Sequence, residues 1–236
     1  MKKKLITIIA TAMALVAPNI LIGANIDNVI YVPGWHRCGR GADEAFRAVQ
    51  GAFPGTVVSS YNWSGNCRWK NARTNADAEA TKLASEIMSM PEDERNRLTL
   101  VGHSLGARIV IRALAKIAKE GKQVKRAVVL AAAMPANDPD IAAFTSASRE
   151  EAVIVCNSKD TMLKWGYNLF GGEKAKALGL NGPVAKPANC RVVNVTPETT
   201  RQTPLTALWS KIDLFRTIAA HYAPFYLEQL KRSSKL

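Results

Sequence analysis

The pentapeptide Gly102-His103-Ser104-Leu105-Gly106 has the residue types needed for nucleophilic attack on an acyl carbon. It matches the pattern G-x-S-x-G, in which a serine sits on a sharp turn between a strand and a helix. So tight a turn crowds the positions two residues before and after the serine, and only small residues fit there. The pattern therefore predicts that Ser104 is a catalytic nucleophile.

The flanking residues supply the strand and the helix that such a turn requires. Residues 98–101 are a short apolar run, typical of a buried parallel strand. After the turn, apolar residues recur at helical spacing: Ile109, Val110, Ala113, Leu114 and Ile117. The Leu105 N–H is then expected at a helix N-terminus, where it would stabilise a developing oxyanion.

A serine hydroxyl is a weak nucleophile until a neighbouring imidazole takes its proton, and the chain has only three histidines. His221 follows the last predicted strand and precedes a predicted helix, and we interpret it as the general base. His103 is expected to point away from Ser104 and to serve packing or hydrogen bonding. His36 lies in the loop after the first strand. It is interpreted either as an ordinary polar loop residue or as a residue that orients the substrate.

The base needs a carboxylate that orients it and stabilises its charged form. Asp160 follows the apolar residues 152–156, and we interpret it as this acid. Asp138 and Asp140 are alternatives after the preceding strand. Asp138-Pro139 also has the residue types of a helix start, and we favour that structural interpretation for this pair.

The elements that must position these residues alternate along the chain. Strands are expected at residues 28–32, 56–61, 98–101, 126–132, 152–156 and 190–195. Helices are expected at residues 45–49, 75–88, 141–148 and 222–231, and from residue 105 to a stop at Gly121. This alternation predicts an α/β fold with a mostly parallel sheet, whose active site lies at the carboxyl ends of the strands.

With these motifs, the chain resembles the α/β-hydrolase superfamily, whose triad residues follow one another as Ser, acid and His. Ser104, Asp160 and His221 occur in that order. The resemblance covers residues 28 to about 230, but outside the motifs it is topological. It implies a three-layer sandwich with helices on both faces of the sheet, and a serine hydrolase of the esterase or lipase type that needs no cofactor or metal.

Val32-Pro33-Gly34-Trp35 is similar to the oxyanion loop of this superfamily, with Pro33 where a histidine is usual. The resemblance places a second oxyanion donor at the Trp35 N–H, beside that of Leu105. Trp63 lies at another strand end, where it lines the acyl pocket or packs at the rim. The candidate substrate contacts are Gly34, His36, Trp63 and His103.

The connections leave no room for a large cap domain, because only about 20 residues separate the fourth and fifth predicted strands. The site is therefore expected to be open. An acyl ester, including one on an anionic surface, is the expected substrate. The alternatives are an acyltransferase on the same triad and a non-catalytic, envelope-binding protein on a hydrolase fold.

The N-terminus has the pattern of a secretory signal peptide, with three lysines before an apolar stretch that ends at Ala24. We expect a signal peptide over residues 1–24, a single domain over residues 25–236, and a periplasmic or secreted monomer. A retained membrane anchor is the alternative, because the apolar stretch approaches the ~20 residues that span a bilayer.

The net charge of +13 falls to +10 when the three lysines of residues 1–24 are removed. Such a charge favours binding to an anionic surface, with peripheral membrane contact at most. The alternative is that it serves solubility alone. The scattered charge and few aromatic residues give no nucleic-acid pattern. Four cysteines in an exported chain predict two disulfides, and strand adjacency favours Cys38–Cys67 and Cys156–Cys190 over the other connectivities.

Overall fold

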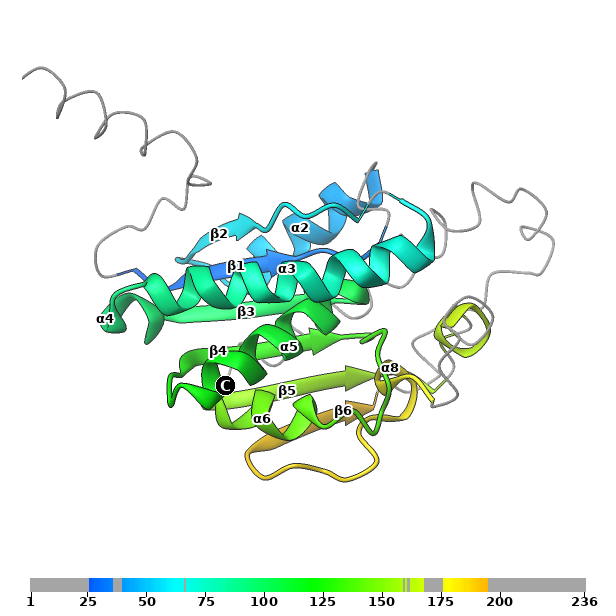
Figure 1. Cartoon of the computed structure of the whole chain (residues 1–236). Helices are drawn as coiled ribbons and strands as arrows, with labels where there is room; N and C mark the ends of the chain where they lie inside the picture. Colours follow the sequence, from blue (N-terminus) through cyan, green and yellow to red (C-terminus); the bar gives the residue numbers. More distant parts are fainter. Residues whose placement is uncertain are drawn as a thin grey trace, which may run out of the picture.

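The computed structural model describes residues 26–35, 40–65, 67–158, 160, 162–167 and 176–194. The predicted signal peptide lies outside them, as do His36, Cys38 and His221. The described residues form a six-stranded sheet in the order β2-β1-β3-β4-β5-β6 (Figure 1). The strands are β1 (Asn28–Val32), β2 (Val57–Ser60), β3 (Leu98–His103), β4 (Val124–Leu130), β5 (Ser148–Cys156) and β6 (Cys190–Asn194).

All neighbouring strands of this sheet are parallel, and each of the six overlaps the apolar run that predicted it, although β5 begins four residues earlier than predicted, at Ser148. The central strands are buried on both sides, and every residue of β1 is buried. When both faces of a strand are covered, the side chains on each face must be apolar. This explains the continuous apolar runs of the sequence. The edge strands β2 and β6 are only partly buried.

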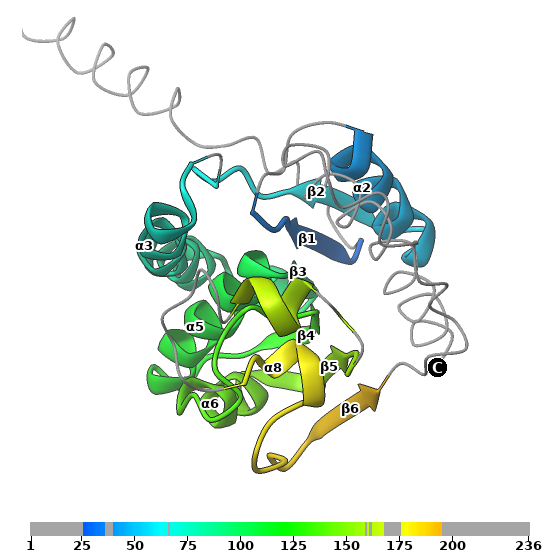
Figure 2. The same cartoon turned by 90° about the vertical axis from the view of Figure 1, so that its right-hand side faces the viewer.

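Helices cover both faces of the sheet. They are α2 (Arg40–Ala52), α3 (Trp69–Ser89), α4 (Glu92–Arg95), α5 (Leu105–Lys119), α6 (Asp140–Ser146) and α8 (Leu178–Asn181), with a π-helical segment η2 (Met162–Tyr167). Figure 2 shows α3, α5 and α6 on one face and α2 on the other. The structure thus confirms the predicted three-layer α/β fold. Between β4 and β5 the chain forms only α6 and short loops, without a large cap.

Helix α3 begins six residues before the predicted start at residue 75. Its buried side is formed largely by small residues at helical spacing, and Ala72 and Ala76 are fully buried. Alanine has the highest helix propensity but adds little to an apolar pattern, so the first turns of α3 look polar in the sequence.

The strand order brings the site to one place in the sheet. From β1 the chain moves to β2 on one side and then crosses to β3 on the other side. In open parallel sheets, ligands bind outside the carboxyl ends of the strands at the point where the direction of winding changes. Here that point lies between β1 and β3, which end next to Pro33 and Ser104.

The predicted disulfide between Cys156 and Cys190 is wrong. Both residues are buried free thiols, and burial raises the pKa of each to about 11. In the register of β5 and β6, Cys190 pairs with Ala152 and Cys156 pairs with Asn194. The two cysteines are therefore offset by four residues in the strand register, which is roughly 13 Å along the strands. A disulfide needs Cα atoms within about 7 Å.

Cys67 is half-buried, and its predicted partner Cys38 lies outside the described residues. The Cys38–Cys67 pairing stays a prediction. Across the parts of the chain that the structure describes, no helix is both long enough and apolar enough to span a membrane.

Candidate active site

Ser104 has the strained backbone that the G-x-S-x-G pattern predicts. Its φ of 55° and ψ of −117° place a non-glycine residue at positive φ, a conformation that costs about 1–3 kcal/mol and occurs preferentially at functional sites. Two hydrogen bonds hold the turn against the last residue of β4 and the loop that follows this strand. The Ser104 N–H donates to the Leu130 carbonyl at 3.0 Å, and the Ala133 N–H donates to the Ser104 carbonyl at 3.1 Å.

A Cβ is excluded at both flanking glycines, by the turn itself at Gly102, as the sequence predicts, and by the end of β1 at Gly106. A Cβ on Gly102 would lie 2.7 Å from the Cα of Ala107. A Cβ on Gly106 would lie 2.0 Å from the Val32 carbonyl oxygen and 2.5 Å from that of Pro33. Distances this short are clashes with backbone atoms, which cannot move aside as a flexible side chain can. The missing Cβ of Gly106 therefore lets the end of β1 pack against the start of α5.

Leu105 is the first residue of α5, which places its N–H at the N-terminus of a 15-residue helix. None of the described carbonyl groups accepts a hydrogen bond from it. A helix N-terminus carries a partial positive charge and favours anions. The Leu105 N–H thus has the position expected of an oxyanion donor.

The loop after β1 lies directly against Ser104. A Cβ on Gly34 would be 2.9 Å from the Cβ of Ser104 and 3.2 Å from the Nδ1 of His103. This contact brings the residue before Trp35 next to Ser104, as the predicted oxyanion loop requires. The half-buried Trp35 side chain donates from Nε1 to the Cys67 carbonyl at 2.7 Å. Its ring meets the edge of Trp69 at a centroid distance of 5.1 Å.

Trp63 is 3% exposed, and its Nε1 donates to the Pro33 carbonyl at 2.8 Å. The ring also packs against Gly65, where an added Cβ would lie 2.8 Å from its Cζ2 atom. This burial favours the packing interpretation of Trp63 over the acyl-pocket interpretation. The sequence contains no pattern that reveals the hydrogen bond to Pro33, because the two residues are 30 positions apart.

His103 ends β3 beside Gly34 and is partly buried. Burial disfavours its charged form and lowers the pKa of His103 to about 4. The side chain is therefore neutral near pH 7. Its place inside the turn agrees with the expected packing or hydrogen-bonding role.

The low pKa of His103 predicts that stability rises with pH. Between about pH 4 and 6.5 the unfolded chain binds a proton at this residue that the folded chain does not bind. The free energy of unfolding should increase by up to about 3 kcal/mol over this range, because one pKa unit corresponds to about 1.36 kcal/mol. Urea unfolding of the wild type and of His103→Asn at pH 4.5, 5.5 and 7 measures this effect. The increase in the free energy of unfolding with pH should be smaller in His103→Asn than in the wild type. An equal increase in both proteins would contradict the prediction.

Asp160, the predicted catalytic acid, lies just after β5 and is 3% exposed. Its Oδ1 accepts a hydrogen bond from the Leu163 N–H at 3.0 Å, and its own N–H donates to the Asn157 carbonyl at 3.0 Å. The Asn157 N–H donates in turn to the Gly179 carbonyl of α8 at 2.8 Å. Asp160 is therefore held at the same edge of the sheet as Ser104, two strands away.

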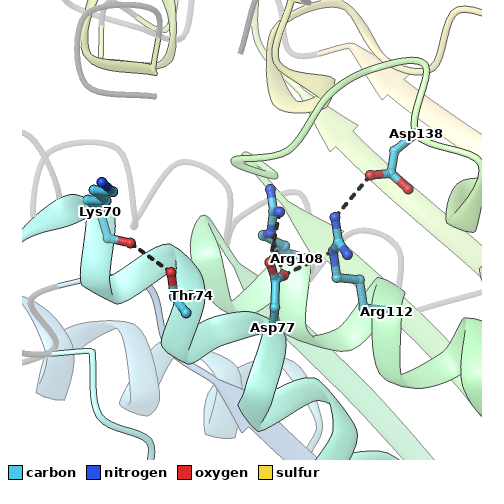
Figure 3. A network of polar contacts seen from close by, with 6 residues as sticks. All are labelled: Lys70, Thr74, Asp77, Arg108, Arg112 and Asp138. Carbon is cyan, nitrogen blue, oxygen red and sulfur yellow. Dashed lines mark hydrogen bonds and ion pairs between the residues drawn. The ribbon is translucent and has the colours of Figure 1, made fainter. Parts of the chain in front are cut away.

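Asp138 has a structural role on the helical face (Figure 3). Its Oδ1 accepts the Asp140 N–H at 3.0 Å at the start of α6. Its Oδ2 binds the Arg112 guanidinium at 3.3 Å. Helix α6 begins at Asp140, so the structure agrees with a helix start at Asp138-Pro139.

The same cluster joins α5 to α3, a link that sequence reasoning missed. Asp77 on α3 binds Arg108 through Nε at 2.8 Å and Nη2 at 3.1 Å, and Arg112 through Nε at 3.1 Å (Figure 3). Arg108 is 3% exposed, one turn after Ser104. The spacing of the two arginines by four residues is the sequence signal that could have indicated a shared partner. The cluster ties α5, the helix that follows Ser104, to α3.

The structure thus brings Ser104, Leu105, Gly34 and Trp35 together and places Asp160 at the same edge of the sheet. His36 and His221 lie outside the described residues, so their predicted roles stay predictions.

A parallel sheet with a strained serine between its third strand and the following helix, and with the β1 loop against that serine, defines an α/β-hydrolase fold. The chain belongs to the family described as "Protein of unknown function (DUF726)", whose model matches residues 5–198. No curated protein matches the chain.

Solved structures with some similarity include hydrolases. A type II thioesterase from the yersiniabactin biosynthetic pathway is 14% identical, with a TM-score of 0.45 over 86% of this chain and 96% of the other. A carboxyl esterase from the mycorrhizal fungus Tuber melanosporum is 12% identical, with a TM-score of 0.43 over 87% and 79%. A metagenomic carboxyl esterase is 14% identical, with a TM-score of 0.48 over 91% and 77%.

Proposed function

We propose that this protein is a serine hydrolase that cleaves an acyl ester through a covalent acyl-enzyme. Ser104 is the nucleophile, His221 is the general base and acid, and Asp160 orients His221. The N–H groups of Leu105 and Trp35 form the oxyanion hole. The observation that carries the proposal is the strained backbone of Ser104, at positive φ between two glycines that tolerate no Cβ.

In the proposed cycle, Ser104 Oγ attacks the ester carbonyl carbon while His221 takes the hydroxyl proton. The two N–H groups hold the negative charge that develops on the carbonyl oxygen. The tetrahedral intermediate then collapses, and His221 returns the proton to the departing alcohol. Water, deprotonated by His221, then attacks the acyl carbon of the acyl-enzyme. The bond from that carbon to Ser104 Oγ breaks, the carboxylic acid leaves, and His221 returns the proton to Oγ, which restores the Ser104 hydroxyl.

We propose further that the enzyme is exported and acts on an acyl ester at an anionic surface. The N-terminal pattern of three lysines and an apolar stretch supports export. The positive net charge supports attraction to an anionic surface.

Reaction with a fluorophosphonate tests the proposal, because this probe phosphonylates an activated serine. The folded full chain should form one adduct, and mass spectrometry of its peptides should map that adduct to Ser104. The exposed Ser146 on α6 serves as an internal control that should remain unmodified. A folded protein without an adduct, or with one only at other serines, would contradict the proposal.

A further inference from the structure

Gly34 is a glycine in the loop that carries the proposed second oxyanion donor, directly before Trp35. The residue must be glycine because a Cβ would lie 2.9 Å from the Cβ of Ser104. Glycine also has the widest range of backbone angles. The peptide between Gly34 and Trp35, which contains the donor N–H, could therefore rotate unless the groups on both sides of it were held.

Two indole groups hold the loop on both sides of Gly34. On one side, Trp63 Nε1 donates to the Pro33 carbonyl at 2.8 Å. On the other side, Trp35 Nε1 donates to the Cys67 carbonyl at 2.7 Å. The two bonds connect the loop to Trp63 and to Cys67, which both belong to the segment after β2. Because Trp63 is 3% exposed, water has little access to compete for its bond.

The segment that holds the loop is itself anchored. The side-chain amide of Asn75, on α3, donates to the Ser64 carbonyl at 3.0 Å. The Gly65 N–H donates to the Trp63 carbonyl at 2.8 Å, which turns the chain back over the indole ring. The orientation of the oxyanion loop thus depends on contacts that extend to α3.

We propose that Trp63 is a positioning residue of the oxyanion hole, an inference that rests on the proposed hydrolase function. Its indole N–H fixes the Pro33 carbonyl and so restricts the peptide that presents the Trp35 N–H to the substrate. Loss of one oxyanion donor costs about 10²–10³ in kcat. Loss of the Pro33 bond leaves the donor present but less well aligned, and we expect a decrease in kcat of about 10- to 100-fold.

The experiment compares Trp63→Phe with Trp69→Phe in the full chain. Both changes replace an indole with a phenyl ring and remove one N–H donor. Of these two tryptophans, only Trp63 donates a hydrogen bond from Nε1, since the Nε1 of Trp69 has no hydrogen-bond partner among the described residues. The measurements are kcat and KM for an activated acyl ester, and the affinity for a trifluoromethyl ketone, whose serine adduct carries an oxyanion.

Trp63→Phe should lose kcat and ketone affinity by similar factors while KM changes by less than about threefold, because donor alignment matters most in the oxyanion state. Trp69→Phe should stay close to the wild type. Wild-type kcat and ketone affinity in Trp63→Phe, or equal losses in both variants, would overturn the inference. If Trp63→Phe does not fold, Trp35→Phe removes the other indole bond, keeps the backbone N–H and has the same expected result. A wild type that does not react with the fluorophosphonate would overturn the hydrolase proposal itself.

Discussion

Ser104→Ala is expected to lower kcat on an activated acyl ester by about 10⁶-fold, the loss found when the nucleophile of a serine protease is removed. Alanine keeps the Cβ and has no hydroxyl, so neither acyl-enzyme formation nor proton transfer to the base can occur. Only the oxyanion donors remain to assist direct attack by water. The measurement is the rate of ester hydrolysis by purified protein, corrected for the uncatalysed rate.

The same change should leave the fold intact. Serine and alanine are both non-glycine residues, so both experience similar strain at a φ of 55°. We expect the free energy of unfolding to change by less than about 1 kcal/mol. Ser146→Ala is the matched control, because it removes an exposed hydroxyl from α6 and should keep full activity. Substantial hydrolysis by Ser104→Ala would show that another residue is the nucleophile.

Asp160→Asn is expected to lower kcat by about 10⁴-fold, as the corresponding change does in a serine protease. The amide would favour the wrong tautomer of His221 and would leave the imidazolium without a stabilising charge. The side-chain oxygen can still accept the Leu163 N–H, so the loop after β5 should keep its conformation. Ester hydrolysis and thermal unfolding, measured on the same preparation, separate the loss of activity from a loss of structure.

Asp138→Asn is the matched control for this prediction. It makes the same chemical change in a partly buried carboxylate, which binds the Asp140 N–H and Arg112. Asparagine is a good acceptor at a helix start, so α6 should persist. The variant should keep near-normal kcat and lose at most some stability through the weakened ion pair. An active Asp160→Asn enzyme beside an inactive Asp138→Asn enzyme would move the acid to the loop after β4.

Much of the fold could be predicted because its signals are local. A central strand must be apolar where it is buried on both faces, so short apolar runs predict the positions of β1 and β3. The turn at Ser104 is local in part, since a Cβ on Gly102 would clash with residues 106 and 107. A Cβ on Gly106 would instead clash with the Val32 and Pro33 carbonyl oxygens at the end of β1. The helix start at Asp138-Pro139 follows from the same kind of short-range chemistry.

Other features depend on contacts between distant parts of the chain. Strand adjacency was correct for β5 and β6, yet the disulfide prediction failed because pairing register decides which cysteines approach. The start of α3 depends on alanines whose burial becomes visible only when α5 packs against them.

The sequence by itself determined the tight turn at Ser104 and the parallel sheet that places Ser104 at a carboxyl edge. It did so because steric exclusion at a tight turn and burial of a strand act within a few residues. Only the tertiary structure decided that Trp63 holds the Pro33 carbonyl and that Asp138 binds Arg112. Hydrogen bonds and ion pairs of this kind join residues about 30 positions apart, and their partners are selected by how helices and loops pack, which no local pattern records.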